Sequence, residues 1–434
     1  MNKNSVDNMK GLKEKKILVR CDFNVPIKDG IIQDDTRIRA AIPTIKYLLD
    51  NGAKVILCSH MGKPKPKEMT IEEMKEKFTL EPVAKRLEEL LEKKIEFSNE
   101  LTGEETTKKV NELNLGDVLL LENTRFDVRE TKNDETLSLE LANLADGYVN
   151  DAFGTAHRAH ASTEGVASRM KEQGKETALG FLMQKEVEKL SGVLENPEHP
   201  VVVILGGAKV SDKIGVITNL MKIADKIIIG GKMANTFLKA KGYEIGSSGY
   251  EEDKIDIAKE ILQKAEVQNV KICLPVDVHI AKIPEDVEFS LELAEKAEDT
   301  FANIEEGVPE GYTILDIGED SSIKFTEEIE NCKDENNCAN TIIWNGPMGL
   351  TEVKKYAKGT ENLAKFIANN TNAKCIVGGG DSVAAINKVK KEILKDETNN
   401  QGFERFHLST GGGASLEFLE GKLLPGIDII ENKD

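Results

Sequence analysis

Short apolar runs rich in Val, Ile and Leu alternate with charged, helix-forming stretches, and this alternation restricts the fold more than any other feature of the chain. In the first half the apolar runs occupy residues 15–23, 53–60, 117–126 and 147–154. In the second half they occupy residues 200–209, 225–233, 270–278, 312–318, 340–349, 373–382 and 406–415. Nearly continuous apolar strands separated by helices are typical of parallel sheets covered on both faces.

The length divides this pattern into two domains, because 434 residues exceed the size at which one core usually keeps growing. We therefore predict an α/β fold of two Rossmann-like, doubly wound parallel-sheet domains joined by a helical hinge. Residues 179–194 have apolar side chains at helical spacing, which favours a linking helix, and an ordinary surface helix is the alternative. The expected boundaries are 1–180 and 181–410, followed by a segment, 411–434, that packs back towards the hinge and the N-terminal domain.

Composition argues against several function classes. A formal net charge of -18 disfavours a nucleic acid or an anionic membrane as partner, since both require a broad basic surface. No apolar run approaches the roughly 18 residues of a membrane span. The first residues lack the apolar core of a signal peptide, so we expect a cytoplasmic protein. Cys332 and Cys338 lie in residues 331–340, "NCKDENNCAN", which we interpret as an exposed loop insertion rather than a metal site.

Arginine is scarce and unevenly placed. Only nine of the 58 basic residues are Arg, and eight of these precede residue 170. The polar strand ends "RCDFNVP", "SHMGKP", "ENTRF" and "FGTAHRAH" would bring cationic and titratable groups to one edge of the first sheet, because ligands bind beyond the carboxyl ends of parallel strands. These groups are Arg20, Asp22, Asn24, His60, Lys63, Arg125, His157, Arg158 and His160, which Arg37 and Arg39 could join. The pattern favours a site for a phosphorylated, carboxylate-bearing metabolite over separate surface ion pairs.

The strand ends of the second half supply glycines instead, in "GGAKVSDK", "GGKMANT", "WNGPMG", "GGGDS" and "STGGGAS". Glycine turns before helices let phosphate approach backbone N–H groups, so five of them favour a nucleotide. Neither G-x-x-x-x-G-K-[ST] nor G-x-G-x-x-G is present. Lys209 and Lys213 would project from one face of a helix start towards phosphate, or into solvent. Asp381 would be a ligand of nucleotide-bound Mg²⁺, or a helix N-cap.

In their order, these strings, together with "DDTRIRA" and "LLENTRF", resemble the phosphoglycerate kinase family from about residue 11 to the C-terminus. The resemblance implies a usually monomeric, two-domain glycolytic phosphotransferase with a carboxyl acceptor. Its members reversibly move the acyl phosphate of 1,3-bisphosphoglycerate to Mg-ADP, giving 3-phosphoglycerate and ATP. The N-terminal domain would bind the glycerate and the C-terminal domain the nucleotide, and closure of the two would bring the substrates together.

The resemblance also assigns residues. The catalytic pair is Arg37 and Lys209. The glycerate set is Asp22, Phe23, Asn24, Arg37, His60, Met61, Gly62, Lys63, Arg125 and Arg158. The nucleotide set is Lys213, Gly231, Gly318, Asn345, Pro347, Glu352, Gly379, Gly380, Asp381 and Ser382, with Asp381 beside Mg²⁺ and with Gly411, Gly412 and Gly413 as a second phosphate loop.

Four positions depart from the family pattern. Met61 and Lys63 stand where Leu and Arg are usual, Lys232 replaces a glycine, and Thr351 replaces a common Phe. A Lys at position 63 would reduce a bidentate phosphate contact to a point charge. Two alternatives are another small-metabolite kinase on the same scaffold and a catalytically silent nucleotide-binding or scaffold protein.

Overall fold

The computed structural model describes residues 2–284, 287–331, 338–393 and 401–433. The chain forms two compact units, one of Met1–Glu188 with Leu423–Asp434 and one of Lys189–Lys422. The first boundary falls within helix α7 (Phe181–Glu195), the segment in which we predicted a linking helix. Residues 411–422 belong to the second unit, so the segment that returns to the first unit is shorter than the sequence prediction.

The first unit contains a six-stranded, all-parallel sheet in the order β5-β6-β4-β1-β7-β8. Its strands are β1 (Lys16–Arg20), β4 (Lys54–Cys58), β5 (Ile95–Phe97), β6 (Val118–Leu120), β7 (Gly147–Asn150) and β8 (Glu176–Leu179). The four predicted strands are β1, β4, β6 and β7. The sequence prediction missed the two edge strands, which are short and include the polar residues Glu96, Glu176 and Thr177.

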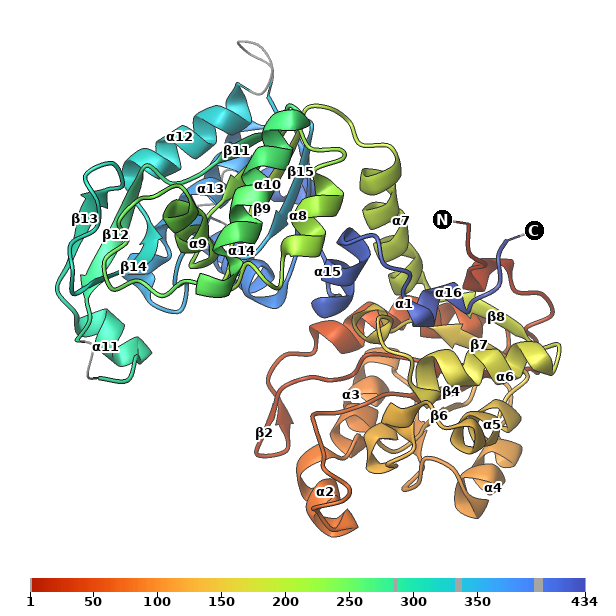
Figure 1. Ribbon diagram of the computed structural model, residues 1–434. Helices are drawn as coiled ribbons and strands as arrows, with labels where there is room; N and C mark the ends of the chain where they lie inside the picture. Colours follow the sequence, from red (N-terminus) through yellow and green to blue (C-terminus); the bar gives the residue numbers. More distant parts are fainter. Residues whose placement is uncertain (1, 285–286, 332–337, 394–400, 434) are drawn as a thin grey trace. The chain divides into compact units, whose positions relative to one another are not determined.

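Helices and one hairpin complete this unit. The helices are α1 (Thr36–Asp50), α2 (Ile71–Phe78), α3 (Glu81–Leu91), α4 (Glu104–Glu112), α5 (Glu135–Asn143), α6 (Val166–Glu172), the first part of α7, and α16 (Pro425–Asp428), and the hairpin pairs β2 (Ile27–Lys28) with β3 (Ile31–Ile32). The C-terminal segment is anchored here, because the Asn150 side-chain amide donates a hydrogen bond to the Gly426 carbonyl at 2.9 Å. A bridge between Lys3 and Asn432 places the two ends of the chain together (Figure 1).

The second unit contains another six-stranded parallel sheet, in the order β11-β10-β9-β15-β16-β17. Its strands are β9 (Val201–Leu205), β10 (Lys226–Ile229), β11 (Lys271–Cys273), β15 (Thr341–Asn345), β16 (Lys374–Gly378) and β17 (Phe406–Leu408). Its helices are α8 (Ile214–Leu220), α9 (Met233–Ala240), α10 (Ile255–Val267), α11 (Leu291–Lys296), α12 (Glu319–Glu330), α13 (Lys358–Asn370), α14 (Gly380–Ile393) and α15 (Gly413–Leu419). The strand order reverses between β9 and β15, which is where ligands bind in sheets of this kind.

One part of the strand prediction is wrong. The run 312–318 does not join the parallel sheet, because β14 (Tyr312–Ile317) pairs antiparallel with β12 (Asp277–Lys282), whose other edge pairs with β13 (Asp299–Asn303). Pro275 interrupts the run 270–278, so this run contributes β11 to one sheet and the start of β12 to the other. The run 331–340 falls partly on residues 332–337, so Cys332 lies outside the described part of the chain.

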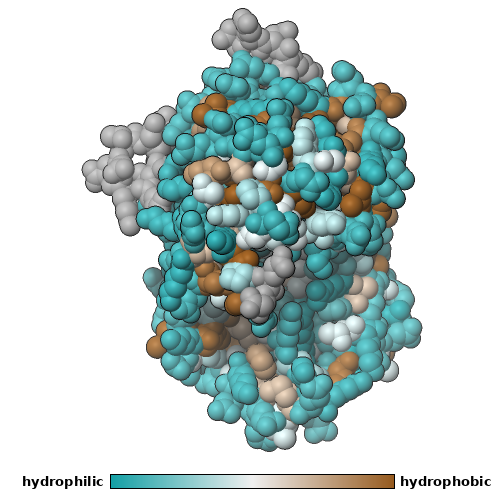
Figure 2. All heavy atoms as spheres, turned by 60° about the vertical axis from the view of Figure 1, so that its left-hand side comes forward, coloured by the Kyte–Doolittle hydropathy of each residue, from teal (hydrophilic) through white to brown (hydrophobic). Residues whose placement is uncertain are grey.

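Each parallel sheet packs against a large buried cluster of apolar side chains, and a smaller buried cluster includes Ala281 and Ile283 beside the antiparallel sheet. Hydrophilic residues cover most of the face drawn in Figure 2, with hydrophobic ones scattered among them. Within the described residues, none of the helices is long and apolar enough to cross a lipid bilayer.

A buried carboxylate fixes the start of α7. The Asp151 side chain is fully buried, and its Oδ1 atom accepts hydrogen bonds from the backbone N–H groups of Leu182 at 2.9 Å and Met183 at 3.2 Å. The residue before the helix, Gly180, supplies no capping side chain, and a Cβ there would lie 2.2 Å from the same oxygen. Asp151 therefore caps α7 from the end of β7.

This cap gives the stability of the first unit a dependence on pH. Burial raises the pKa of Asp151 to about 6, so the contribution of this carboxyl is most stabilising below about pH 4 and is lost as the pH rises through about 6. We expect the free energy of unfolding of wild type, relative to Asp151→Asn, to fall by about 2 kcal/mol between pH 4 and pH 7. Amide hydrogen exchange of β1 and β7 measures this difference in the free energy of unfolding. The partly buried α5 cap Asp134, whose pKa is lowered chiefly by a hydrogen bond from Thr136, should show the opposite sign in Asp134→Asn. A pH-independent difference for Asp151→Asn would contradict the assignment.

Candidate active site

The carboxyl ends of β1 and β4 bring polar side chains together in the first unit. The Asp22 carboxylate accepts a hydrogen bond from Arg37 Nη1 at 2.8 Å and another from the backbone N–H of Asn24 at 3.2 Å. Asn24 Oδ1 in turn accepts from the Gly62 N–H at 2.8 Å, and Arg125 Nη1 donates to the Gly62 carbonyl at 2.7 Å. Five predicted glycerate-binding residues thus form one connected network.

Arg37 is the exposed member of this network. Its side chain is 40% exposed, and Asp22 is its only hydrogen-bond partner among the described residues. A guanidinium has five N–H donors in a planar fork, so most of the Arg37 donors remain available to an anion.

His60 lies beside a buried arginine that sets its tautomer. Arg20 is 1% exposed and donates from Nε to Ser162 Oγ at 2.8 Å, while its Nη2 lies 3.3 Å from His60 Nδ1. Because a guanidinium can only donate, Nδ1 must be the acceptor, and the imidazole proton then sits on Nε2. Burial first, and then the positive charges of Arg20, Arg125 and Arg37, hold the pKa of His60 well below its usual value. His60 is therefore a neutral imidazole that offers one N–H donor.

His160 and Arg158 join the same cluster. Burial, followed by the charges of Arg125, Arg20 and Arg158, lowers the pKa of His160 to about 4. Arg158 is exposed, and its Nε donates to His157 Nε2 at 3.1 Å. The positive charge of the cluster comes from guanidinium groups, while His60 and His160 are neutral near pH 7. We define Arg20, Arg37, His60, Arg125, Arg158 and His160 as the arginine cluster.

Three predicted glycerate residues contribute differently. The side chains of Phe23 and Met61 are buried in the core beneath the sheet, so only their backbones are near the cluster. Lys63 is exposed directly after Gly62. Arg39 does not join the cluster, because its Nε pairs with Asp35 Oδ1 at 2.9 Å on the same helix.

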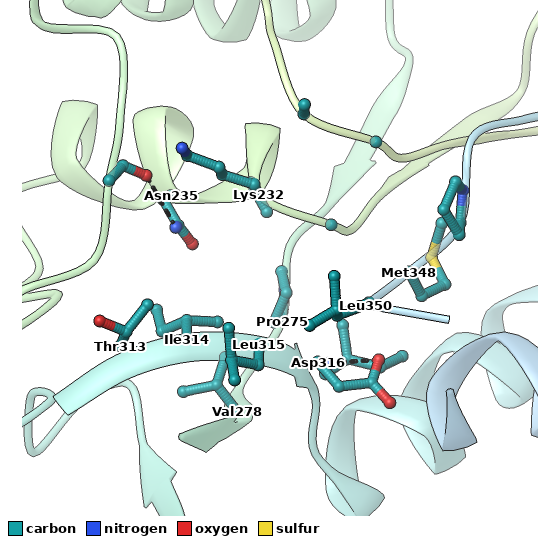
Figure 3. Close-up of a pocket in the computed structure, with 18 of the residues that line it drawn as sticks. Lys232, Asn235, Pro275, Val278, Thr313, Ile314, Leu315, Asp316, Met348 and Leu350 are labelled. Carbon is teal, nitrogen blue, oxygen red and sulfur yellow. Dashed lines mark hydrogen bonds between the residues drawn. The ribbon is translucent and has the colours of Figure 1, made fainter. Parts of the chain in front are cut away.

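The second unit contains a cavity of about 430 Å³ (Figure 3). Its walls come from the turns after β9, β10 and β15, from α9, and from the antiparallel strands β12 and β14. The apolar lining side chains include Leu238, Val278, Ile283, Ile314, Leu315, Met348 and Leu350. Four predicted nucleotide residues line it, namely Gly231, Pro347, Glu352 and Asp381. A concave, mainly apolar site with a few polar groups suits a flat aromatic ligand.

Backbone hydrogen bonds join the glycine turns at the mouth of this cavity. The Gly207 N–H donates to the Pro347 carbonyl at 3.0 Å, and the Gly231 N–H donates to the Met348 carbonyl at 2.9 Å. Gly231 has a φ of +65°, and a Cβ built there would lie 2.5 Å from the Gly207 nitrogen. Residue 231 must be glycine because two backbone segments, at Gly207 and Gly231, approach each other too closely for a side chain.

The two predicted phosphate lysines occupy different environments. Lys213 is 8% exposed, and its Nζ lies 3.4 Å from the Asn345 carbonyl oxygen, whereas Lys209 is exposed. Burial lowers the pKa of Lys213 to about 8, against the opposing effect of Asp212, Asp381 and Glu420. The prediction that both lysines project from one face of a helix is wrong, because α8 begins only at Ile214. Glu251 holds the preceding loop out of a helix by accepting the N–H groups of Val210 and Ser211.

The turn after β16 places Asp381 within the cavity wall. The N–H of Val383 donates to the Gly379 carbonyl, so Gly379 and not Asp381 occupies the N-cap position of α14. The Asp381 side chain is exposed, while Ser382 is buried and accepts the Gly346 N–H at 2.6 Å. The N-cap interpretation of Asp381 is therefore wrong, and its carboxylate faces ligand space.

Gly318 and the second phosphate loop lie outside the cavity lining. A Cβ at Gly318 would lie 2.0 Å from Asp277 Oδ2, and Asp277 caps α12 by accepting the N–H groups of Ser321 at 2.6 Å and Asp320 at 3.2 Å. The structure thus gives Gly318 a packing reason that is independent of any nucleotide. Gly411 and Gly412 precede α15 and Gly413 is its first residue. In the same helix, Ser415 Oγ would lie 3.2 Å from a Cβ at Gly378, near the β16 turn.

Comparisons with known proteins bear on these two sites. A family model described as phosphoglycerate kinase matches residues 6–422. The chain belongs to the phosphoglycerate kinase family. It is 52% identical to phosphoglycerate kinase from Clostridium perfringens (strain ATCC 13124) over 434 residues, covering 100% of this chain and 99% of the relative. Identity to the Thermosipho africanus relative is 52% over 425 residues, covering 97% and 96% of the two chains.

Solved structures of phosphoglycerate kinases have the same fold. The enzyme from Coxiella burnetii aligns with a TM-score of 0.81 at 39% identity, and that from Pyrococcus horikoshii with a TM-score of 0.76 at 33% identity. Each alignment covers 98% of both chains. The fold prediction of two parallel-sheet α/β units is therefore confirmed, as is the resemblance to phosphoglycerate kinases.

The far wall of the cavity contains two buried polar residues that the sequence prediction did not include. Asn235 and Asp316 line it, and both are buried. Burial raises the pKa of Asp316 to about 8, although its carboxyl accepts the N–H groups of Ile317 at 2.9 Å and Gly359 at 2.8 Å. The only signal in the sequence was a polar residue in each of two otherwise apolar segments.

Proposed function

We propose that this phosphoglycerate kinase family member reversibly transfers the acyl phosphate of 1,3-bisphosphoglycerate to Mg-ADP, giving 3-phosphoglycerate and ATP. The observation that carries the proposal is the contrast between the two units. The strand ends of one unit supply guanidinium and imidazole donors around a site for an anion. The strand ends of the other supply tightly joined glycine turns beside an apolar cavity. The two substrates are an anionic three-carbon acid and a nucleotide, and they require these two environments.

The arginine cluster supports the glycerate part of the proposal. Arg125, Arg158 and the His60 Nε2–H would bind the phosphate and carboxylate of 3-phosphoglycerate, with Asp22 and Asn24 on the hydroxyl. Gly62 and Lys63 add a turn and an exposed cation, and Phe23 and Met61 shape the site from the core. The acceptor carboxylate is already ionised at neutral pH, so no general base is required, in agreement with the neutral His60 and His160.

The cavity and its mouth support the nucleotide part. The base would occupy the apolar cavity near Gly231 and Pro347, the ribose would meet exposed Glu352, and the phosphates would extend to Lys213 and the turn formed by Gly379, Gly380 and Ser382. Other residues of the predicted nucleotide set do not line the cavity and would support this arrangement through packing; these are Asn345, Gly318 and Gly411–Gly413.

Asp381 is the candidate magnesium ligand. No group of three or more His, Cys, Asp or Glu side chains able to hold a metal ion occurs in the described part of the chain. A single exposed carboxylate fits Mg²⁺ that is bound mainly by phosphate oxygens and water. When bound with the nucleotide, Mg²⁺ would neutralise phosphate charge.

Arg37 and Lys209 are the proposed catalytic pair. Phosphoryl transfer depends on in-line positioning and on neutralising charge on the moving group, and it needs no covalent protein nucleophile. Arg37 has unused donors in the glycerate-binding unit, and Lys209 is exposed beside the glycine turns of the nucleotide-binding unit. Because acceptor and donor must come within about 3.5 Å, the two units must bring their ligands together during turnover.

A coupled assay tests the proposed function. With 3-phosphoglycerate and Mg-ATP, the full chain should produce ADP at a rate that depends on 3-phosphoglycerate. Consumption of ATP only with a different acceptor would favour another small-metabolite kinase. Nucleotide binding without turnover on any glycerate would favour a silent binding protein.

The pKa of Lys213 predicts how ADP affinity depends on pH. Burial lowers the pKa of Lys213 to about 8, and the ammonium form binds phosphate, so ADP binding above pH 8 must be accompanied by proton uptake. We expect ADP affinity to fall about tenfold from pH 7.5 to pH 9. Calorimetry at several pH values measures it. Lys213→Arg, which stays charged, should remove most of this fall, and an equal fall in that variant would exclude Lys213 as its source.

A further inference from the structure

The far wall of the cavity holds one buried amide whose orientation is fixed. Asn235 lies in α9 and is 1% exposed, and its Nδ2 donates a hydrogen bond to the Gly249 carbonyl oxygen at 3.1 Å (Figure 3). A carbonyl oxygen can only accept, so the nitrogen of the amide must face Gly249. The Oδ1 atom of Asn235 is thereby directed to the other side.

The Asn235 Oδ1 atom is an acceptor without a donor. It is buried and has no hydrogen-bond partner among the described residues, and Asn235 lines the cavity. Most of the lining near it is apolar, including Leu238, Ile314 and Leu315. Buried polar atoms are nearly always hydrogen-bonded in native proteins, so an unpaired acceptor in such a wall indicates a ligand that donates.

The position of Asn235 points to the base end of a nucleotide. The phosphate groups are proposed to meet Lys213 and Asp381, which follow the parallel strands. Asn235 instead belongs to a wall formed by α9, Ser247, Gly249 and β14. In the view of Figure 3, Asn235 and Thr313 lie on one side of the cavity and Met348 on the other. An apolar slot with one inward acceptor matches a flat ring that carries an amino group.

We propose that Asn235 Oδ1 accepts a hydrogen bond from the exocyclic amino group of the nucleobase, so that the cavity selects 6-aminopurine over 6-oxopurine nucleotides. The inference rests on the proposed nucleotide site and names the group that reads the base. A 6-oxo group would place a second acceptor against Oδ1, leaving both oxygens without a donor.

The test compares ADP with inosine diphosphate, which carries oxygen in place of the 6-amino group and a proton on the neighbouring N1. One neutral hydrogen bond is worth roughly a two- to tenfold change in affinity. Wild-type full chain should therefore bind ADP about tenfold more tightly than inosine diphosphate in calorimetry at pH 7.5. This comparison needs no variant, so it remains decisive even if a substituted protein folds poorly. Equal affinities would overturn the inference.

A variant and a matched control assign the preference to Asn235. Asn235→Leu should bring the ratio of the two dissociation constants close to one, mainly by weakening ADP. Asn219→Leu removes a comparable bond, from an amide Nδ2 to the Leu419 carbonyl at 2.8 Å, outside the cavity lining. That control should keep the wild-type ratio.

The remaining possible results have distinct meanings. An unchanged preference in Asn235→Leu would overturn the inference. So would a loss, in Asn235→Leu, of discrimination against 2′-deoxy-ADP instead of discrimination against inosine diphosphate, because the donor to Asn235 would then be a ribose hydroxyl. If wild type bound neither ADP nor inosine diphosphate, the proposed function itself would fail, whereas ADP binding without base preference would remove only the role of Asn235.

Discussion

Arg37→Ala should lower kcat for ATP formation by about three orders of magnitude while changing ADP affinity by no more than about twofold. Arginines that stabilise a transferring phosphoryl group contribute factors of this size. The structure leaves Arg37 partly exposed and bound to a single partner, Asp22. Its guanidinium lies in the first unit, whereas the proposed nucleotide site lies in the second. We therefore expect ADP affinity to be unaffected. Steady-state kinetics and calorimetry on the same preparation measure both quantities.

Arg39→Ala is the matched control. Arg39 lies two residues further along α1, its side chain is 56% exposed, and it pairs with Asp35. An exposed pair of this kind contributes little to stability, and the control should retain nearly wild-type turnover. Wild-type turnover in Arg37→Ala would remove Arg37 from the mechanism, and a parallel loss in Arg39→Ala would point to disruption of the helix instead.

Gly231→Ala should weaken ADP binding by about a hundredfold and destabilise the second unit. The added Cβ would lie 2.5 Å from the Gly207 nitrogen and 2.8 Å from the Pro347 carbonyl oxygen, and backbone atoms at these distances can only move apart. The φ of +65° adds a conformational cost of about 1–2 kcal/mol. Separating these turns would displace the groups that are proposed to hold the base and phosphates. ADP calorimetry and hydrogen exchange of β9 and β10 measure the two effects.

Gly242→Ala separates conformational cost from crowding. Gly242 also has a positive φ, +89°, but a Cβ there would meet nothing within 4 Å. This variant should lose about 1 kcal/mol of stability and keep its ADP affinity. If Gly231→Ala bound ADP as tightly as Gly242→Ala does, the joined turns would not form the nucleotide site.

Sequence alone predicted the central strands of both sheets because their burial on both faces leaves continuous apolar runs. The edge strands β5 and β8 were missed because they are only three and four residues long and contain Glu96, Glu176 and Thr177, which interrupt any apolar run. The antiparallel sheet also escaped notice, because the run 312–318 is as apolar as a parallel strand and its partner is decided by tertiary contacts.

The arginine cluster was predictable because parallel strand ends converge on one edge. The structure adds contacts that residue spacing in the sequence does not reveal. One example is the hydrogen bond donated by Arg20 that fixes the tautomer of His60. Lys209 and Lys213 were placed on a helix because they are four residues apart, but Glu251, 40 residues away, holds the intervening loop in another conformation. Asn235 lies in α9, just after the Gly230–Gly231 turn, and sequence analysis assigned it no role because an unpaired acceptor can be recognised only from its three-dimensional surroundings.

Binding of the two ligands by different units is tested most directly by hydrogen exchange with one ligand at a time. With 3-phosphoglycerate alone, protection should increase at residues 20–24, 59–63 and 157–160. With Mg-ADP alone, it should increase at residues 206–213, 230–235 and 378–382. Protection of segments from the same unit by both ligands, or of the arginine cluster by Mg-ADP alone, would contradict the account.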